Sequence, residues 1–242
     1  RELAMTAHTV IYAPIGQATR SEQVVERLGN AIIAGLLEAN EQLPNEADLS
    51  RLMGVSPVTV REALNTLRVK GLIDTRRGRN GGSFVCELSA NQVLQQQPLR
   101  QVSNEYLADL CEFHSAILSH SAKLATQRTT PQQLSKLHEL ILTFQDAQSA
   151  DVRAQTDMRC LLMIVAYAQS SRLANQELAI QAEWLPLVAT LYKNDKIHMQ
   201  TVAEYLKLFA CLQQQDADAA AQQAQNLLDT LTDQMLEYKL TL

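Results

Sequence analysis

Two short segments with helical apolar spacing flank a Gly54-Val55-Ser56 turn, and this arrangement constrains the fold more than any other feature of the chain. Asn45 can cap a helix over 46–53, and Gly54 can end it because glycine adopts the left-handed conformation without steric cost. Ser56 is a good N-cap, and Pro57 suits the first turn of a helix. The sequence therefore predicts two helices joined by a tight turn, the second running over about 57–69.

A helix before this pair and a hairpin after it complete the predicted domain. Apolar residues recur at helical spacing between 20 and 37. Beyond Gly71, strand candidates at 72–75 and 83–86 flank the glycine-rich turn at 78–82. This order of elements is typical of a winged helix-turn-helix, with the hairpin as the wing.

Helical spacing continues almost throughout the rest of the chain. The predicted fold class is mainly α, with an N-terminal winged helix-turn-helix that has a small β wing and a C-terminal all-α bundle of about six helices. The expected organisation is a flexible tail over 1–18, the winged helix-turn-helix domain over 19–87, a linker over 88–102 and the all-α domain over 103–242.

Charge is distributed unevenly along the chain. The formal net charge is −5, but residues 51–85 hold seven arginines and lysines against two acidic residues. A local basic patch on an acidic protein is what contact with nucleic-acid phosphates requires. The alternative is a solvated charged surface.

Other features exclude several classes of protein. The longest apolar run, 160–168, is too short to span a bilayer, and we expect no secretory signal. The four cysteines lie far apart, which predicts neither a zinc site nor a disulfide framework. We therefore expect a cytoplasmic, nucleoid-associated protein with no membrane partner.

The helix predicted at 57–69 has two different faces. Val60, Ala63, Leu64 and Leu67 share one face and are expected to pack on Leu49, Leu52 and Met53. The other face and the wing offer groups for bases and phosphates. The predicted DNA-binding residues are Ser56, Val58, Thr59, Arg61, Asn65, Arg76, Arg77, Arg79 and Gly81. The alternatives are helix capping for Ser56, a salt bridge from Arg61 to Asp48 or Glu62, and solubility for the wing arginines.

The same stretch resembles the N-terminal domain of the GntR family of bacterial transcription regulators. The shared motifs are Leu43-Pro44-Asn45-Glu46, Gly54-Val55-Ser56, Val60-Arg61-Glu62-Ala63-Leu64, Gly71-Leu72 and Gly82-Ser83-Phe84-Val85. Two positions that are often arginine in the family are Ala47 and Pro57 here. The resemblance therefore implies DNA binding but does not carry over an operator sequence.

The helical part is similar to the FCD effector-binding domain of the FadR branch of this family. The resemblance implies that Asp157 and Leu161 stand where many members have an Asp-x-x-x-His pair. Tyr205 and Asn226 stand where they have two further metal-binding histidines, and His114 replaces an early arginine that often pairs with the effector carboxylate. Because Leu161 cannot ligate and the imidazoles are missing, we predict no metal site and no cofactor.

The same comparison implies an effector pocket that includes His114, Asp157, Leu161, Tyr205 and Asn226. The alternative for His114 is a partly buried histidine whose hydrogen bonds are made within the protein. The alternative for Asp157 is a buried pair with another side chain. Trp184, Tyr192 and Tyr205 either line a cavity or belong to the core, the commoner place for single aromatic residues. His120, His138 and His198 are expected at surface or supporting positions. The effector is a small organic acid or a more apolar, acyl-CoA-like molecule, unless effector binding has been lost.

These features predict a sequence-specific, DNA-binding bacterial transcription regulator that is controlled by a small-molecule effector. We expect a homodimer that binds a pseudo-palindromic, double-stranded DNA operator. The alternative is a helical enzyme or an interaction scaffold whose winged helix does not regulate transcription. We expect no enzyme, because the chain has no HExxH motif, no Gly-Lys-Ser/Thr phosphate loop and no paired histidines.

Overall fold

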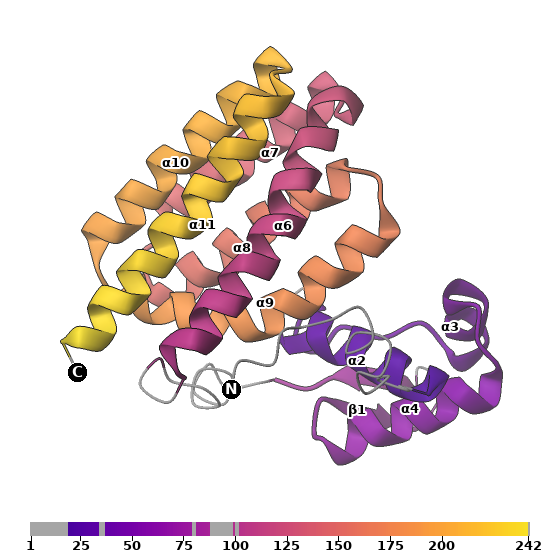
Figure 1. Cartoon of the computed structure of the whole chain (residues 1–242). Coiled ribbons are helices and arrows are strands. Elements are labelled where there is room, and N and C mark those ends of the chain that lie inside the picture. The colour runs from indigo at the N-terminus through magenta and orange to yellow at the C-terminus, as the bar shows by residue number, and fades with distance from the viewer. Residues whose placement is uncertain (1–18, 34–36, 79–80, 88–98, 100–101, 242) are drawn as a thin grey trace, which may run out of the picture.

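The computed structural model describes residues 19–33, 37–78, 81–87, 99 and 102–241. The first domain consists of α2 (Arg20–Ile33), α3 (Glu46–Met53), α4 (Pro57–Val69), β1 (Ile73–Arg76) and β2 (Gly82–Val85). The second consists of α6 (Asn104–Arg128), α7 (Pro131–Asp146), α8 (Ala150–Tyr167), α9 (Ser171–Leu191), α10 (Asp195–Gln214) and α11 (Ala217–Leu240). Figure 1 confirms the predicted class, a winged helix-turn-helix followed by an all-helical bundle. The predicted tail, 1–18, and nearly all of the predicted linker lie outside the described residues.

The turn between α3 and α4 has the predicted geometry. Asn45 caps α3, with its side-chain oxygen accepting from the Asp48 backbone N–H at 2.9 Å. Gly54 ends α3 with a φ of 65°, in the left-handed region. Ser56 caps α4 by accepting from the Thr59 backbone N–H at 3.1 Å. The two N-caps thus each satisfy a free backbone N–H, and the glycine cap satisfies a free carbonyl group at the end of α3.

The core of the first domain differs from expectation at a few positions. The predicted face of α4 and Leu49 are buried, but Leu52 is exposed, so its predicted core position is wrong. Helix α2 ends at Ile33. In the wing, Ile73 is paired with Val85 and both are buried, which shifts each strand by one residue from its predicted range. Burial of this pair sets the register.

The second domain surrounds one large core. Helix α11 packs along α6, α8 along α9, and α10 along α11 (Figure 1). Its largest fully buried side chains include Trp184, Tyr192, Tyr205 and Phe144. Helix α2 of the first domain packs against both α4 and α9, so α9 connects the bundle with the winged helix domain. None of the described helices combines the length and apolarity needed to cross a membrane.

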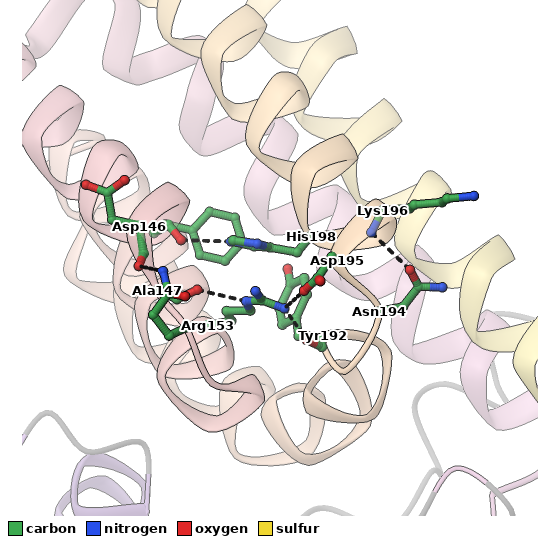
Figure 2. A network of polar contacts seen from close by, with 10 residues as sticks. Asp146, Ala147, Arg153, Tyr192, Asn194, Asp195, Lys196 and His198 are labelled. Carbon is green, nitrogen blue, oxygen red and sulfur yellow. Dashed lines mark hydrogen bonds and ion pairs between the residues drawn. The ribbon is translucent and has the colours of Figure 1, made fainter.

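Arg153 of α8 binds the ends of two other helices (Figure 2). Its Nε donates to the Ala147 carbonyl after α7 at 2.9 Å, and its Nη1 donates to the Tyr192 carbonyl after α9 at 2.9 Å. The same Nη1 lies 2.8 Å from Asp195 Oδ1. A cation at helix C-termini satisfies free carbonyl groups and opposes the negative end of each helix dipole. Arg153 therefore anchors the loops on either side of the bundle core.

We predict that Arg153→Met destabilises the protein by roughly 2–4 kcal/mol, because two buried carbonyl groups lose their donor. Asp195→Ala should cost less than about 1 kcal/mol, because that carboxylate is exposed. Urea unfolding followed by circular dichroism measures both free energies. Equal losses in the two variants would assign the stability to the ion pair and contradict the capping role.

Candidate functional site

The predicted DNA-binding residues of α4 lie on the side that faces away from the core. We call them the recognition face: Ser56, Val58, Thr59, Arg61 and Asn65. All are exposed except Thr59, which is half-buried. Val58 is 61% exposed, an apolar side chain with no core partner. The recognition face is therefore accessible to a macromolecular partner.

Arg61 forms an ion pair within the domain, but with a different partner from those expected. Its Nη2 and Nε donate to Glu46 Oε2 at 2.9 and 3.2 Å, whereas Asp48 pairs with Arg51. The alternative of a surface salt bridge for Arg61 is thus confirmed, with Glu46 as the partner in place of Asp48 or Glu62. The hydrogen bond and the charge of Glu46 raise the pKa of Arg61. Because both side chains are exposed, the pair contributes little stability, and Arg61 can exchange it for another anion.

The wing holds one of its arginines in place. The Arg76 guanidinium lies 4.3 Å from the centre of the Phe84 ring, and its Nη2 donates to Asn40 Oδ1 at 2.7 Å. Arg77 is exposed, and Arg79 lies outside the described residues. A Cβ on Gly81 would come within 2.6 Å of the Arg76 carbonyl oxygen, so the turn needs glycine there. Arg77 is the described wing arginine best placed to bind phosphate.

Asn65 serves partly to support the domain. Its side-chain oxygen accepts from Arg68 Nη1 at 2.6 Å, while Arg68 Nε donates to Thr75 Oγ1 at 2.8 Å. This chain of contacts ties α4 to β1. Sequence reasoning missed Glu46, Asn40 and Arg68 as supporting residues, because their partners are distant in sequence or on another element.

A second group of polar side chains is completely buried between the helices of the second domain. We call it the buried polar cluster: His114, Asp157, Glu177, Gln181, Trp184, Tyr192 and Tyr205. Each of these side chains has a relative exposure of 0%. They come from α6, α8, α9 and α10, with Tyr192 just after α9. A cluster of this kind is costly unless its members are paired.

Its members form two linked sets. The Tyr205 hydroxyl donates to Asp157 Oδ1 at 2.5 Å. In the other set His114 Nε2 lies 2.9 Å from Glu177 Oε1, which also accepts from Gln181 Nε2 at 2.6 Å. The charges of both His114 and Glu177 act on the pKa of Asp157. The two sets therefore belong to one region of the core.

Sequence reasoning named three members of this cluster as pocket residues but missed others. The signal that could have found Glu177 and Gln181 is their spacing of four residues, which places both on one face of α9 together with Trp184. The Trp184 ring meets His114 edge-on with ring centroids 4.9 Å apart. The tryptophan thus packs against one of the polar pairs.

Other residues named from the sequence lie elsewhere. Asn226 is exposed and its side-chain oxygen accepts from Gln222 at 3.0 Å, so it does not join the cluster. His198 is buried and lies 2.8 Å from the Phe144 carbonyl, which corrects its surface assignment in favour of a supporting one. Leu161 is buried within the apolar core. His120 is exposed, and His138 stacks on Phe209.

Burial dominates the electrostatics of the cluster. It raises the pKa of Asp157 to about 7, although the hydroxyls of Tyr205 and Tyr192 and the charge of His114 act in the opposite direction. Burial also raises the pKa of both tyrosines. The neutral carboxyl group is therefore favoured at Asp157 below about pH 7, and the ionised form above it.

Known proteins with similar domains identify the class of this chain. Residues 20–85 match the family described as bacterial regulatory proteins, gntR family, and residues 109–230 match the FCD domain. The HTH-type transcriptional regulator RmpR of Mycobacterium gastri is 35% identical over 224 residues, covering 87% of this chain and 78% of the relative. This chain belongs to the GntR family of bacterial regulatory proteins. It is a DNA-binding transcription regulator with a C-terminal effector-binding domain.

Further relatives extend over most of the chain. The galactonate operon transcriptional repressor of Escherichia coli is 26% identical over 228 residues, covering 90% of this chain and 97% of the repressor. The structure of Escherichia coli McbR/YncC shares the fold, with a TM-score of 0.53, 20% identity and coverage of 91% and 98%. The family domains and the names of the relatives do not favour an enzyme or a scaffold.

Many FCD domains bind a metal ion, as the family resemblance implies. The residues of this chain at the corresponding positions do not form such a metal site. Leu161 offers no ligand atom, and Asn226 is exposed. Within the described residues, no group of three or more histidine, cysteine, aspartate or glutamate side chains is arranged to hold a metal ion. That the protein binds no metal stays a prediction.

We predict that Asp157 makes the stability of this regulator depend on pH. Its pKa is about 7 in the folded protein against an ordinary value of 3.8, so between these values the folded state binds more protons than the unfolded state. The contribution of Asp157 to the free energy of unfolding is therefore fully present below about pH 4. It is lost as the pH rises to about 7, by at most about 1.4 kcal/mol per pH unit.

Urea unfolding at pH 5, 6, 7 and 8 tests this dependence. Asp157→Asn should lose the component that falls with pH, while the exposed Asp233→Asn should retain it. The same pH slope in the wild type and in both variants would contradict the assignment.

Proposed function

We propose that this GntR-family regulator acts as a homodimer that binds a pseudo-palindromic operator through two recognition faces and wings. The observation that carries the DNA-binding role is an exposed Arg61 on a capped helix whose opposite face is fully packed. A two-fold dimer presents the same surface twice, so its operator repeats the half-site with the matching symmetry.

Each residue of the recognition face has a chemical role in this proposal. Arg61 leaves Glu46 for a guanine edge or a phosphate, both of which accept two hydrogen bonds from a guanidinium. Ser56 and Thr59 lie at the N-terminus of α4, where free backbone N–H groups favour phosphate oxygens. Arg77 on the wing binds the neighbouring backbone. Ala47 and Pro57 are exposed and bring no charge, so the operator differs from those of arginine-bearing relatives.

We place the effector in the buried polar cluster. Helix α9 carries Glu177, Gln181 and Trp184 and packs on α2, which in turn packs on the recognition helix α4. An effector that moves α9 therefore acts on the position of α4 through one intervening helix. It changes DNA affinity only by the difference in its own affinity for the two arrangements.

We predict that Arg61→Ala weakens binding to DNA from the protein's own promoter region by about 10- to 100-fold. Fluorescence anisotropy at two salt concentrations measures the loss. If Arg61 contacts a phosphate, the variant should also show a smaller salt dependence by about one counterion. Lys207→Ala, an exposed cation on α10, is the control and should bind like the wild type. Unchanged affinity in Arg61→Ala would exclude the recognition face.

We predict that two chains bind one operator. Sedimentation velocity should give a dimer of the free protein, and a labelled duplex should titrate at two chains per site. Moving one half-site by half a helical turn should abolish tight binding, because the second recognition face then points away from its groove. A monomer bound with full affinity to a single half-site would contradict this arrangement.

A further inference from the structure

Six buried polar atoms of the cluster make no hydrogen bond of normal geometry to any described residue, although the Tyr192 hydroxyl is near enough to Asp157 to affect the pKa of that carboxyl group. They are His114 Nδ1, Asp157 Oδ2, Glu177 Oε2, Gln181 Oε1, Trp184 Nε1 and the Tyr192 hydroxyl. Each unmet group of this kind costs about 1–3 kcal/mol, and native proteins contain few of them. Their concentration in one region indicates an occupant that supplies hydrogen bonds.

The unpaired oxygens determine what that occupant must offer. The Gln181 amide oxygen can only accept, and the free oxygens of Asp157 and Glu177 can only accept when their carboxyl groups are ionised, a form that a bound cation favours. An occupant rich in N–H donors meets this demand. The Trp184 N–H and the Tyr192 hydroxyl provide donors for a smaller polar group on the same molecule.

The charges of the cluster favour a cation over an anion as its occupant. The cluster contains two carboxyl groups and one histidine, His114, which pairs with Glu177, but no lysine or arginine. Arg153 is buried one turn before Asp157 on α8, but it is already bound to two carbonyls and to Asp195. A buried anion would meet two carboxyl groups and a histidine that is already paired with one of them, whereas a cation would pair with Asp157 and favour its ionised form.

Several aromatic rings lie within this cluster and beside it. The Phe144 ring centroid lies 5.5 Å from that of Tyr192 and 5.7 Å from that of Tyr205, and Trp184 packs on His114. Aromatic faces attract ammonium groups, most strongly where water is excluded. Carboxylates together with aromatic rings are a common chemical basis for recognising organic cations.

We propose that the buried polar cluster binds a small organic ammonium ion, held by the carboxylates of Asp157 and Glu177 and by the surrounding aromatic rings. This inference rests on the proposed function, in which the cluster is the effector site, and it names the class of effector. It replaces the organic acid that the family resemblance favoured.

A panel of matched compounds tests the class of ligand on the full chain. It consists of butylammonium, butanol and butyrate at equal ionic strength, extended to methylammonium, hexylammonium and 1,4-butanediammonium. Calorimetry should show saturable binding of at least one ammonium at one per chain. That compound should bind at least tenfold more tightly than the alcohol and carboxylate of the same skeleton. Absence of saturable binding by every ammonium compound overturns the proposal.

Isosteric variants locate the site. Asp157→Asn and Glu177→Gln should each weaken ammonium binding at least tenfold, and Glu139→Gln, an exposed carboxylate on α7, should leave it unchanged. Should a cluster variant fail to fold, the comparison of ammonium with carboxylate on the wild type still decides the ligand class. Ammonium binding that no folded cluster variant weakens overturns the assigned site.

DNA binding separates this inference from the proposed function. Butyrate binding that the cluster variants abolish would overturn the ammonium class while leaving the effector site in place. Ammonium binding that leaves operator affinity unchanged would support the ligand class but contradict the proposed switch.

Discussion

The guanidinium of Arg153 connects the ends of two helices of the second domain. It binds the carbonyls that follow α7 and α9, and no apolar side chain could satisfy those groups. By fixing the end of α9 it also positions Tyr192, whose hydroxyl faces Asp157. One buried cation thus connects the end of α9 with a residue of the buried polar cluster.

Helix α9 links the buried polar cluster to the DNA-binding surface. It contributes three side chains to the buried polar cluster and packs against α2 of the winged helix domain. Helix α2 supports α4, whose outer face carries Arg61. A change in the cluster therefore has a short, packed route to the DNA-binding surface, and stiff helices transmit displacement well because protein interiors are close-packed.

Local rules predicted the first domain well. The caps at Asn45, Gly54 and Ser56 and the buried face of α4 follow from neighbours within four residues, where backbone geometry leaves few choices. Errors arose where distant contacts decide. Leu52 is exposed, and Arg61 pairs with Glu46, 15 positions away. The family resemblance placed Asn226 in the effector pocket, but this residue is exposed and lies outside the buried polar cluster.

The sequence by itself determined the class of the protein. Its helix periodicity, its turn residues and a strong motif in the first domain suffice to predict a helical DNA-binding regulator, because short-range spacing encodes them. Only the tertiary structure decided that Glu177 and Gln181 join His114, Asp157 and Tyr205 in one buried region. These residues come from four helices, and their charges acquire chemical meaning only when burial removes water and brings them together.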